Sequence, residues 1–167
     1  MLLQELNSLP RENAIKELEK CCGSSNWVER IVESVPFKNK EQLFSLADEI
    51  WKQCSRKDIL EAFSHHPKIG DVENLRKKFS STLQWASSEQ SGVNSASEKT
   101  LQELAEGNNT YEKKFGYIFI VCATGKSAEE MLVILLQRLK NSSEEEIFIA
   151  AEEQRKITRI RLEKLLS

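Results

Sequence analysis

The chain has 167 residues, 40% of them hydrophobic and 30% charged, with a formal net charge of −2. These totals fit one globular domain, residues 1–167, which is long enough to bury a core without metal or disulfide cross-links. They lack the basic surplus that a nucleic-acid-binding surface requires. The most apolar runs, 117–123 and 131–136, are too short to span a bilayer, and residues 1–10 do not resemble a signal peptide. We therefore expect no nucleic-acid or membrane partner, a cytoplasmic location and four reduced cysteines.

Apolar residues recur at helical spacing along most of the chain. They predict helices over residues 13–22, 27–32 and 43–51, and Gly23 follows the first of these as a stop signal. Only residues 117–122, rich in aromatic and β-branched side chains, favour an extended conformation. One such piece cannot form a sheet alone. The sequence therefore predicts an all-α, single-domain helical bundle with one short extended segment near residues 117–122.

Three serines stand three residues before an acid, which is the spacing of a capping box at a helix start. The pairs are Ser55–Asp58, Ser127–Glu130 and Ser143–Glu146. The last pair predicts a C-terminal helix that runs to about Leu166 and carries Arg161 on its apolar face. An arginine on such a face needs a buried partner or an anionic ligand.

The only two histidines, His65 and His66, are adjacent and are followed by Pro67. Because proline disfavours helix at the preceding residue, we expect the helix before it to end near Phe63 and His66 to be extended. Successive side chains then point to opposite sides, so one histidine can face a pocket while the other faces solvent or caps the helix. A purely structural interpretation competes, since histidine is favourable at a helix C-terminus. Neighbouring histidines chelate poorly and no third ligand has suitable spacing, so no metal site is predicted.

A carboxylate and an amide, Glu89 and Gln90, follow the pair Ser87 and Ser88. Either serine can cap a helix whose first turn carries the acid. Alternatively, Glu89 can face the loop that contains His66, and both interpretations can hold together. A histidine, a glutamate and an arginine converging from three parts of the chain would form a small polar site in an apolar bundle.

Five segments, in this order, resemble the 2-oxo-4-hydroxy-4-carboxy-5-ureidoimidazoline (OHCU) decarboxylase family of the urate pathway. They are CCGSSNWVERIVESVPF (21–37), HHPKIGD (65–71), SSEQSG (87–92), KFGYIFIVCATGKS (114–127) and KITRIRLEKL (156–165). Together they extend over nearly the whole chain. The resemblance implies an all-α enzyme without cofactor or metal, usually a homodimer, which acts on a small molecule supplied by a 5-hydroxyisourate hydrolase.

The resemblance also implies site residues. It makes His66 the catalytic histidine and matches Glu89 and Arg161 to the family's glutamate and arginine. The residues that it implies for substrate binding are Pro67, Ser87, Ser88, Gln90, Phe119, Ile120, Val121, Cys122 and Ala123. The last five form a stretch that touches substrate largely through its main chain.

The chain departs from the family pattern at two points. The commoner family form is His-Pro-Asp-Leu-Ala-Gly, whereas residues 66–71 are HPKIGD, a variant of the same loop. Many members have a serine three residues before the glutamate, where this chain has Ala86. We expect Ser87 or Ser88 to replace that contact.

The chemistry of the family's substrate explains why these residue types are needed. Loss of CO2 leaves electrons that the neighbouring ring C=N accepts, and the intermediate must then be protonated on one face to give (S)-allantoin. We expect His66 to handle the substrate hydroxyl or the proton delivery. Glu89 could orient His66 or hydrogen-bond the ureido group. Arg161 is expected on a ring or ureido oxygen, because a tight pair with the carboxylate would stabilise the ground state.

Two other functions stay open at the level of sequence. A helical protein-binding module without catalysis would use an exposed apolar groove and need none of the three polar residues. A hydrolase of a related ureido compound would use a similar site but would release no CO2.

Overall fold

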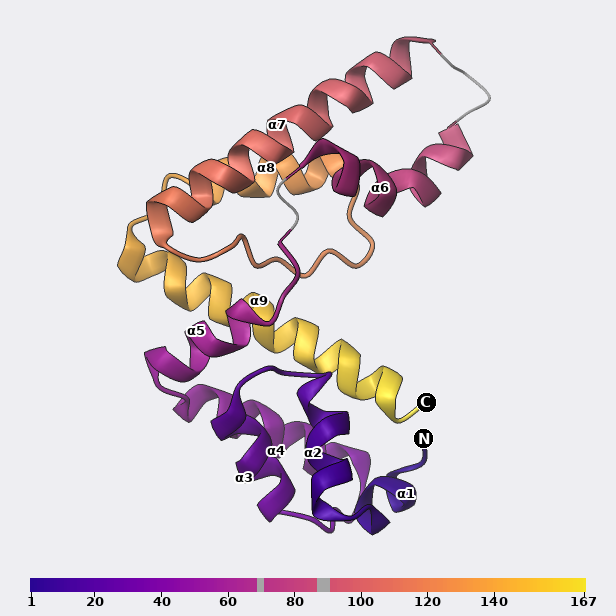
Figure 1. The fold of residues 1–167 in the computed structure, drawn as a ribbon, viewed down its shortest axis with the longest axis vertical. Coiled ribbons are helices and arrows are strands. Elements are labelled where there is room, and N and C mark those ends of the chain that lie inside the picture. The colour runs from indigo at the N-terminus through magenta and orange to yellow at the C-terminus, as the bar shows by residue number, and fades with distance from the viewer. Residues whose placement is uncertain (69–70, 87–90) are drawn as a thin grey trace. The chain divides into compact units, whose positions relative to one another are not determined.

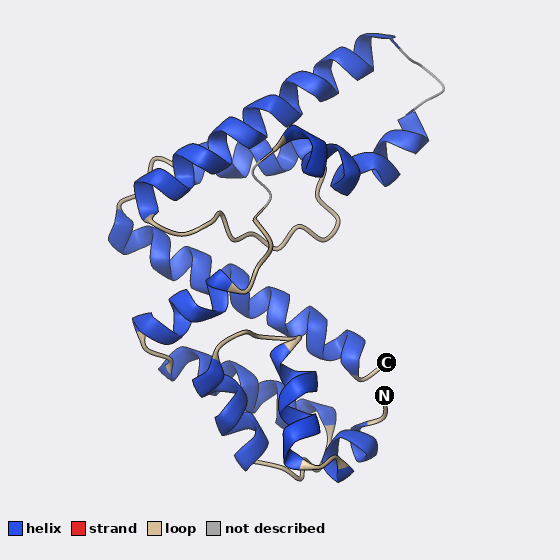
Figure 2. Cartoon of the chain, viewed as in Figure 1, coloured by secondary structure: helices blue, strands red, loops and turns tan. Residues whose placement is uncertain are grey.

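The computed structural model describes residues 1–68, 71–86 and 91–167, with the side chains of residues 80–97 excepted. The regular elements within these ranges are all helices, and no strand occurs among them (Figure 2). The helices are α1 (Leu3–Ser8), α2 (Arg11–Glu19), α3 (Ser25–Glu33), α4 (Lys40–Gln53), α5 (Arg56–Ser64), α6 (Val72–Ala86), α7 (Ser91–Phe115), α8 (Ala128–Arg138) and α9 (Ser143–Leu165). The predicted all-α fold is confirmed. None of the described helices combines the length and apolar character of a membrane span.

The helices predicted from apolar spacing are present as α2, α3 and α4. Helix α3 illustrates why they form. Ser24 caps it by accepting a hydrogen bond from the Trp27 amide at 3.3 Å, and the helix then buries Trp27, Val28, Ile31 and Val32. This i, i+4 pattern turns one face of the helix toward the core. Residues 118–123 are neither helix nor strand, which confirms the extended segment predicted near 117–122.

Two of the three predicted capping boxes are present. Ser55 with Asp58 begins α5, and Ser127 with Glu130 begins α8. The third prediction, Ser143 with Glu146, is wrong by one residue. Ser142 caps α9 instead, because its hydroxyl accepts from the Glu145 amide at 3.2 Å while its own amide donates to the Glu145 carboxylate at 3.0 Å. Glu146 instead forms a buried ion pair with Arg138.

The described chain forms two compact units, which interleave along the sequence. The first unit comprises residues 1–66, 120–122 and 150–167, and the second comprises 67–119 and 123–149. Helix α9 therefore contributes its first turns to the second unit and its longer remainder to the first. The single domain predicted over residues 1–167 stays a prediction.

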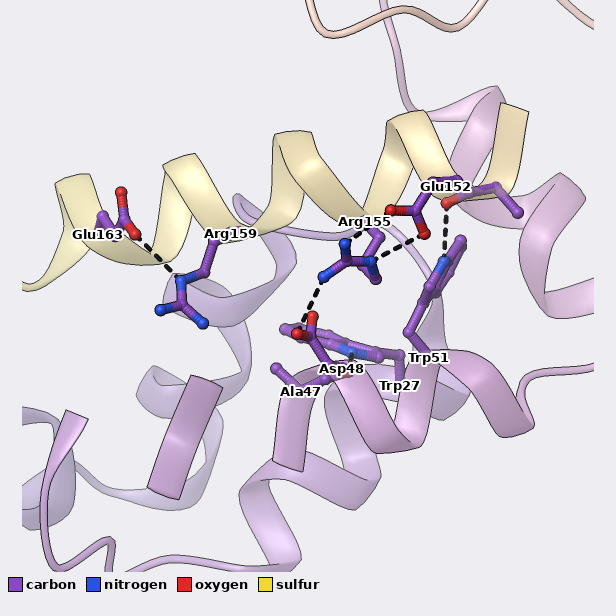
Figure 3. A network of polar contacts seen from close by, with 9 residues as sticks. Trp27, Ala47, Asp48, Trp51, Glu152, Arg155, Arg159 and Glu163 are labelled. Carbon is purple, nitrogen blue, oxygen red and sulfur yellow. Dashed lines mark hydrogen bonds and ion pairs between the residues drawn. The ribbon is translucent and has the colours of Figure 1, made fainter. Parts of the chain in front are cut away.

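The first unit packs α1 to α5 against the C-terminal part of α9 (Figure 1). Its core is a continuous cluster whose fully buried members include Leu6, Leu18, Trp27, Leu43 and Leu162. Burying an aliphatic side chain of this size contributes about 1.5–3 kcal/mol. Two indole groups bind the helices to one another. The Trp27 indole donates to the carbonyl of Ala47 at 3.0 Å, and the Trp51 indole donates to the carbonyl of Ala151 at 2.9 Å (Figure 3).

The second unit is built around the close pairing of α7 and α8. Gly107 makes this pairing possible, since a Cβ atom there would lie 2.6 Å from the Leu135 side chain. The end of α7 and the residues after it bring four aromatic rings together: Tyr111, Phe115, Tyr117 and Phe119. These rings anchor the beginning of the extended segment.

Candidate active site

The two histidines occupy different environments at the end of α5. His65 is the C-cap of the helix, with αR dihedral angles, and is exposed. Its ring lies against Gly23, where an added Cβ atom would come within 2.3 Å of the His65 Cγ. His66 is half-buried. The two histidines thus differ in exposure as expected, and His65 is the helix cap; that His66 faces a pocket stays a prediction.

His66 is held by the C-terminal helix through a buried amide. Its Nε2 atom lies 2.5 Å from the Oε1 atom of Gln154, which is fully buried. The Gln154 amide nitrogen donates to the Thr158 hydroxyl at 3.1 Å, one helical turn further along α9. The ring of His66 is therefore held by Gln154, and Gln154 is held in turn by Thr158; both are buried.

Burial sets the protonation state of His66. Desolvation lowers the pKa of His66 below its ordinary value of 6.5. The hydrogen bond that the ring makes to the Gln154 carbonyl oxygen opposes this effect, and electrostatic interaction with Arg161 and His65 lowers the pKa further. A histidine with a lowered pKa is neutral at physiological pH. It can then accept a proton and return it, which is the behaviour required of a general acid and base.

Arg161 follows Gln154 and Thr158 on the same face of α9, at i+7 and i+3, and is half-buried. Its Nη1 donates to the Lys20 carbonyl at 3.4 Å, and among the described residues it forms no ion pair. Its charge acts on neighbouring groups: burial raises the pKa of the Cys21 thiol to about 11, and Arg161 opposes that rise. His66 and Arg161, two of the three predicted catalytic residues, both belong to the first unit, and the charge of Arg161 acts on the pKa of His66.

The other two arginines of this part of α9 are already neutralised (Figure 3). Arg155 bonds to Glu152 at 2.6 Å and to Asp48 at 3.0 Å. Arg159 bonds to Glu163 at 3.0 Å and lies 3.9 Å from the centre of the Phe44 ring. Arg161 differs from both in having no carboxylate among its described neighbours, so its charge is available to an anionic or carbonyl group of a ligand.

The predicted substrate-binding stretch 119–123 is divided between the two units. Ile120, Val121 and Cys122 belong to the first unit, whereas Phe119 and Ala123 belong to the second. The Cys122 amide donates to the Glu153 carboxylate of α9 at 2.7 Å. A substrate contact of Cys122 would therefore use another of its atoms. In the second unit, the Phe119 ring is held by Tyr111 and by the Arg138 guanidinium, at 5.2 and 4.7 Å between centres.

Of the remaining predicted site residues, the structure describes Pro67 but not residues 87–90. Pro67 is exposed and begins the second unit. Ser87, Ser88, Glu89 and Gln90 lie outside the described residues. Within the described part of the chain, no group of three or more His, Cys, Asp or Glu side chains is arranged to hold a metal ion.

Sequence reasoning missed two groups of polar residues. Gln154 lies on the apolar stripe of the last helix, and its hydrogen-bond partner Thr158 follows four residues later. A glutamine at a core-facing position was the sequence feature that could have indicated a buried polar contact. The second group is the buried ion pair of Arg138 and Glu146, which also contacts the Tyr111 hydroxyl. In the sequence, Arg138 is an ordinary basic residue near the end of a helix, and no local pattern predicts that it is buried in an ion pair.

Comparison with known proteins identifies the family of the chain. The family model for OHCU decarboxylase matches residues 7–163. The chain is 40% identical over 151 residues to the uric acid degradation bifunctional protein TTL of Arabidopsis thaliana, covering 90% of this chain and 47% of that protein. It is 26% identical to the 2-oxo-4-hydroxy-4-carboxy-5-ureidoimidazoline decarboxylase of Haloferax volcanii, covering 100% of this chain and 97% of that protein.

A solved structure is similar to this chain in fold and sequence. It is a crystal structure of OHCU decarboxylase in the presence of (S)-allantoin, with a TM-score of 0.71 and 40% identity over 90% of this chain and 96% of that one. Against the bifunctional relatives the chain is shorter, spanning 47% of the Arabidopsis protein and 32% of the one from Bacillus sp.. The family match over residues 7–163 establishes that the chain belongs to the OHCU decarboxylase family.

Proposed function

We propose that the protein decarboxylates OHCU to (S)-allantoin in urate degradation. The observation that carries this proposal is a half-buried histidine, His66, whose pKa is lowered by burial and by the charge of Arg161, together with the lack of an ion pair between Arg161 and any described carboxylate. Membership of the OHCU decarboxylase family supports it, as does the similarity to an enzyme crystallised with (S)-allantoin.

The reaction breaks one carbon–carbon bond and makes one carbon–hydrogen bond. When the carboxylate leaves as CO2, its bonding electron pair passes into the ring and is accepted by the adjacent C=N. A proton then adds to the carbon that lost the carboxylate. An enzyme must therefore stabilise the negative charge that develops on the ring and deliver one proton to one face.

His66 is assigned the proton chemistry. As a neutral imidazole it can accept the proton of the substrate hydroxyl or serve as the route by which a proton reaches the ring carbon. Arg161 is assigned to a ring or ureido oxygen, where negative charge grows as CO2 departs. Pairing Arg161 with the departing carboxylate would stabilise the ground state and slow the reaction.

The other site residues are carried over from the resemblance. Glu89 would orient His66 or hydrogen-bond the ureido group. Ser87 or Ser88, which follow Ala86 in the sequence, would replace the contact that many family members make through a serine at the position of Ala86. The proposed substrate-binding residues are Pro67, Ser87, Ser88, Gln90, Phe119, Ile120, Val121, Cys122 and Ala123.

A cytoplasmic homodimer is proposed on two observations. The four cysteines, all within the described part of the chain, form no disulfide, which suits a reducing compartment. Large apolar side chains are exposed on the second unit, among them Val133 and Leu136 of α8 and Phe148 of α9. Val133 and Leu136 are one helical turn apart and so share a face, which a second copy of the chain could cover. Sedimentation of the wild type and of Phe148→Glu tests this: a monomeric wild type would contradict the homodimer.

Product analysis tests the activity itself. OHCU is made fresh from urate by the two upstream enzymes, and the protein is added while CO2 release and optical rotation are followed. The proposal predicts fast loss of OHCU with CO2 release and accumulation of (S)-allantoin. Consumption of OHCU without CO2 would instead indicate a hydrolase, and decay at the spontaneous rate to racemic allantoin would indicate a binding module.

A further inference from the structure

We infer that Gln154 is a positioning residue for His66, holding the neutral ring with its proton on Nε2 and leaving Nδ1 as the atom that gains and loses the catalytic proton. This role rests on the proposed decarboxylase function. It arises from geometry in the first unit: the 2.5 Å contact between His66 Nε2 and Gln154 Oε1, and the complete burial of Gln154.

The orientation of the Gln154 amide decides which ring nitrogen carries the proton. The Thr158 hydroxyl oxygen accepts a hydrogen bond from the Gln154 amide nitrogen at 3.1 Å. The Gln154 NH2 group therefore faces Thr158, and its carbonyl faces His66. A carbonyl oxygen 2.5 Å from Nε2 requires a proton on that nitrogen.

The Nδ1 atom of His66 is then free for chemistry. The ring contacts Gln154 through Nε2, and Nδ1 has no hydrogen-bond partner among the described residues. The Gln154 carbonyl accepts from Nε2 in both the neutral and the protonated ring, since both forms carry the Nε2 proton. His66 can therefore cycle between the two forms without breaking its anchor.

A neutral acceptor suits this task better than a carboxylate. The charged groups that face His66 are Arg161 and His65, and both favour the neutral ring, as does burial. A carboxylate at position 154 would oppose them by pairing with the imidazolium. It would hold the ring in its protonated form, which cannot accept a proton. Gln154 provides the orienting hydrogen bond of a histidine–carboxylate pair without its charge.

Nuclear magnetic resonance of the imidazole nitrogens tests the inference without an activity assay. Protein labelled with ¹⁵N-histidine gives signals from two residues only, and His65→Gln assigns them. We expect the neutral His66 ring to carry its proton on Nε2, with that proton visible because exchange is slow. In Gln154→Leu the slowly exchanging proton is expected to disappear. An Nδ1-protonated ring in the wild type, or an unchanged spectrum in Gln154→Leu, would overturn the inference.

The near-isosteric variant Gln154→Glu provides a second test that does not depend on the folding of Gln154→Leu. It is expected to raise the pKa of His66 by about 1–3 pH units, the size of shift that a neighbouring opposite charge produces. The acid limb of the kcat/KM profile should move by the same amount. The matched control is Gln137→Glu, on the exposed face of α8, which should leave the pKa of His66 in place. An unshifted pKa in folded Gln154→Glu would contradict the role of Gln154.

Kinetics separate positioning from binding. Gln154→Leu is expected to lose about 10- to 100-fold in kcat with little change in KM, by analogy with the loss of an outer partner of a metal-ligating histidine. If the wild type proves inactive on OHCU, the proposed function fails while the resonance result still decides the role of Gln154. If the wild type is active and Gln154→Leu keeps its kcat, the inference alone fails.

Discussion

Arg138 and Glu146 form an ion pair inside the second unit, with side chains that are 7% and 0% exposed. The Arg138 Nη2 atom lies 2.5 Å from the Glu146 carboxylate, which also accepts from the Asn141 amide at 3.0 Å and from the Tyr111 hydroxyl. The guanidinium also lies over the ring of Phe119, the first residue of the proposed substrate-binding stretch. This pair therefore connects the stability of the second unit to the placement of that stretch.

Breaking the pair from one side is expected to be costly. Glu146→Gln leaves the Arg138 charge buried without its counter-charge, which typically destabilises a protein by about 3–5 kcal/mol. Urea unfolding measures the loss. The exposed pair Lys99–Glu103, 3.9 Å apart, provides the control, since Glu103→Gln should change stability by no more than about 0.5 kcal/mol. Equal effects of the two substitutions would show that the buried pair contributes nothing special.

Gly23 is expected to be required by the ring of His65. A Cβ atom there would lie 2.3 Å from the His65 Cγ, so Gly23→Ala must displace the histidine turn. Overpacking of this kind costs about 1–3 kcal/mol. Removing the ring in the double variant Gly23→Ala, His65→Gly should restore most of the stability lost by the first substitution. A double-mutant cycle with no coupling between the two sites would disprove the contact.

The lowered pKa of His66 predicts how stability depends on pH. Because the folded pKa lies below the ordinary 6.5, the unfolded chain binds more protons in the interval between the two values. The contribution of His66 is therefore fully present above about pH 6.5 and is lost as the pH falls through the folded-state value. Urea midpoints of the wild type and of His66→Gln should converge or cross as the pH is lowered through this window. A constant difference between pH 5 and pH 8 would mean that the pKa of His66 is not lowered.

Arg161 should be distinguishable from its neighbour on α9. Arg161→Gln removes the charge proposed to stabilise the transition state, and the loss of one such group costs about 10²–10³ in kcat. Arg159→Gln removes an arginine that is paired with Glu163 and lies against Phe44 (Figure 3), so kcat should change little. Steady-state kinetics on fresh OHCU compare the two. Similar kcat values for both variants would remove Arg161 from the catalytic role.

The sequence predicted helices better than it predicted interior polar contacts. Apolar spacing identified α2, α3 and α4, because one face of each helix is buried and the others are not. The start of α9 was missed by one residue because SSEEE at 142–146 permits two capping registers of equal local quality. Burial of Glu146 against Arg138 selects between them, and that contact is tertiary.

Local pattern singled out His66, one of two adjacent histidines before Pro67, and Arg161, on an apolar stripe. Their catalytic roles came from the family resemblance and stay predictions. Gln154 was not identified, since its contact with His66 joins residues 88 positions apart. No local pattern reports such a contact. The side-chain placements of Glu89 and its neighbours lie outside the described residues, so their roles stay predictions.

The most direct test compares the two adjacent histidines on freshly made OHCU, following substrate decay and optical rotation together. The account predicts that His66→Ala loses the formation of (S)-allantoin. His65→Ala removes the exposed cap residue, whose effect on the pKa of His66 is only the smallest of those that act on it, and should keep (S)-allantoin formation within about threefold. A folded His66→Ala protein that still forms (S)-allantoin at the wild-type rate would contradict the central claim that His66 handles the catalytic proton.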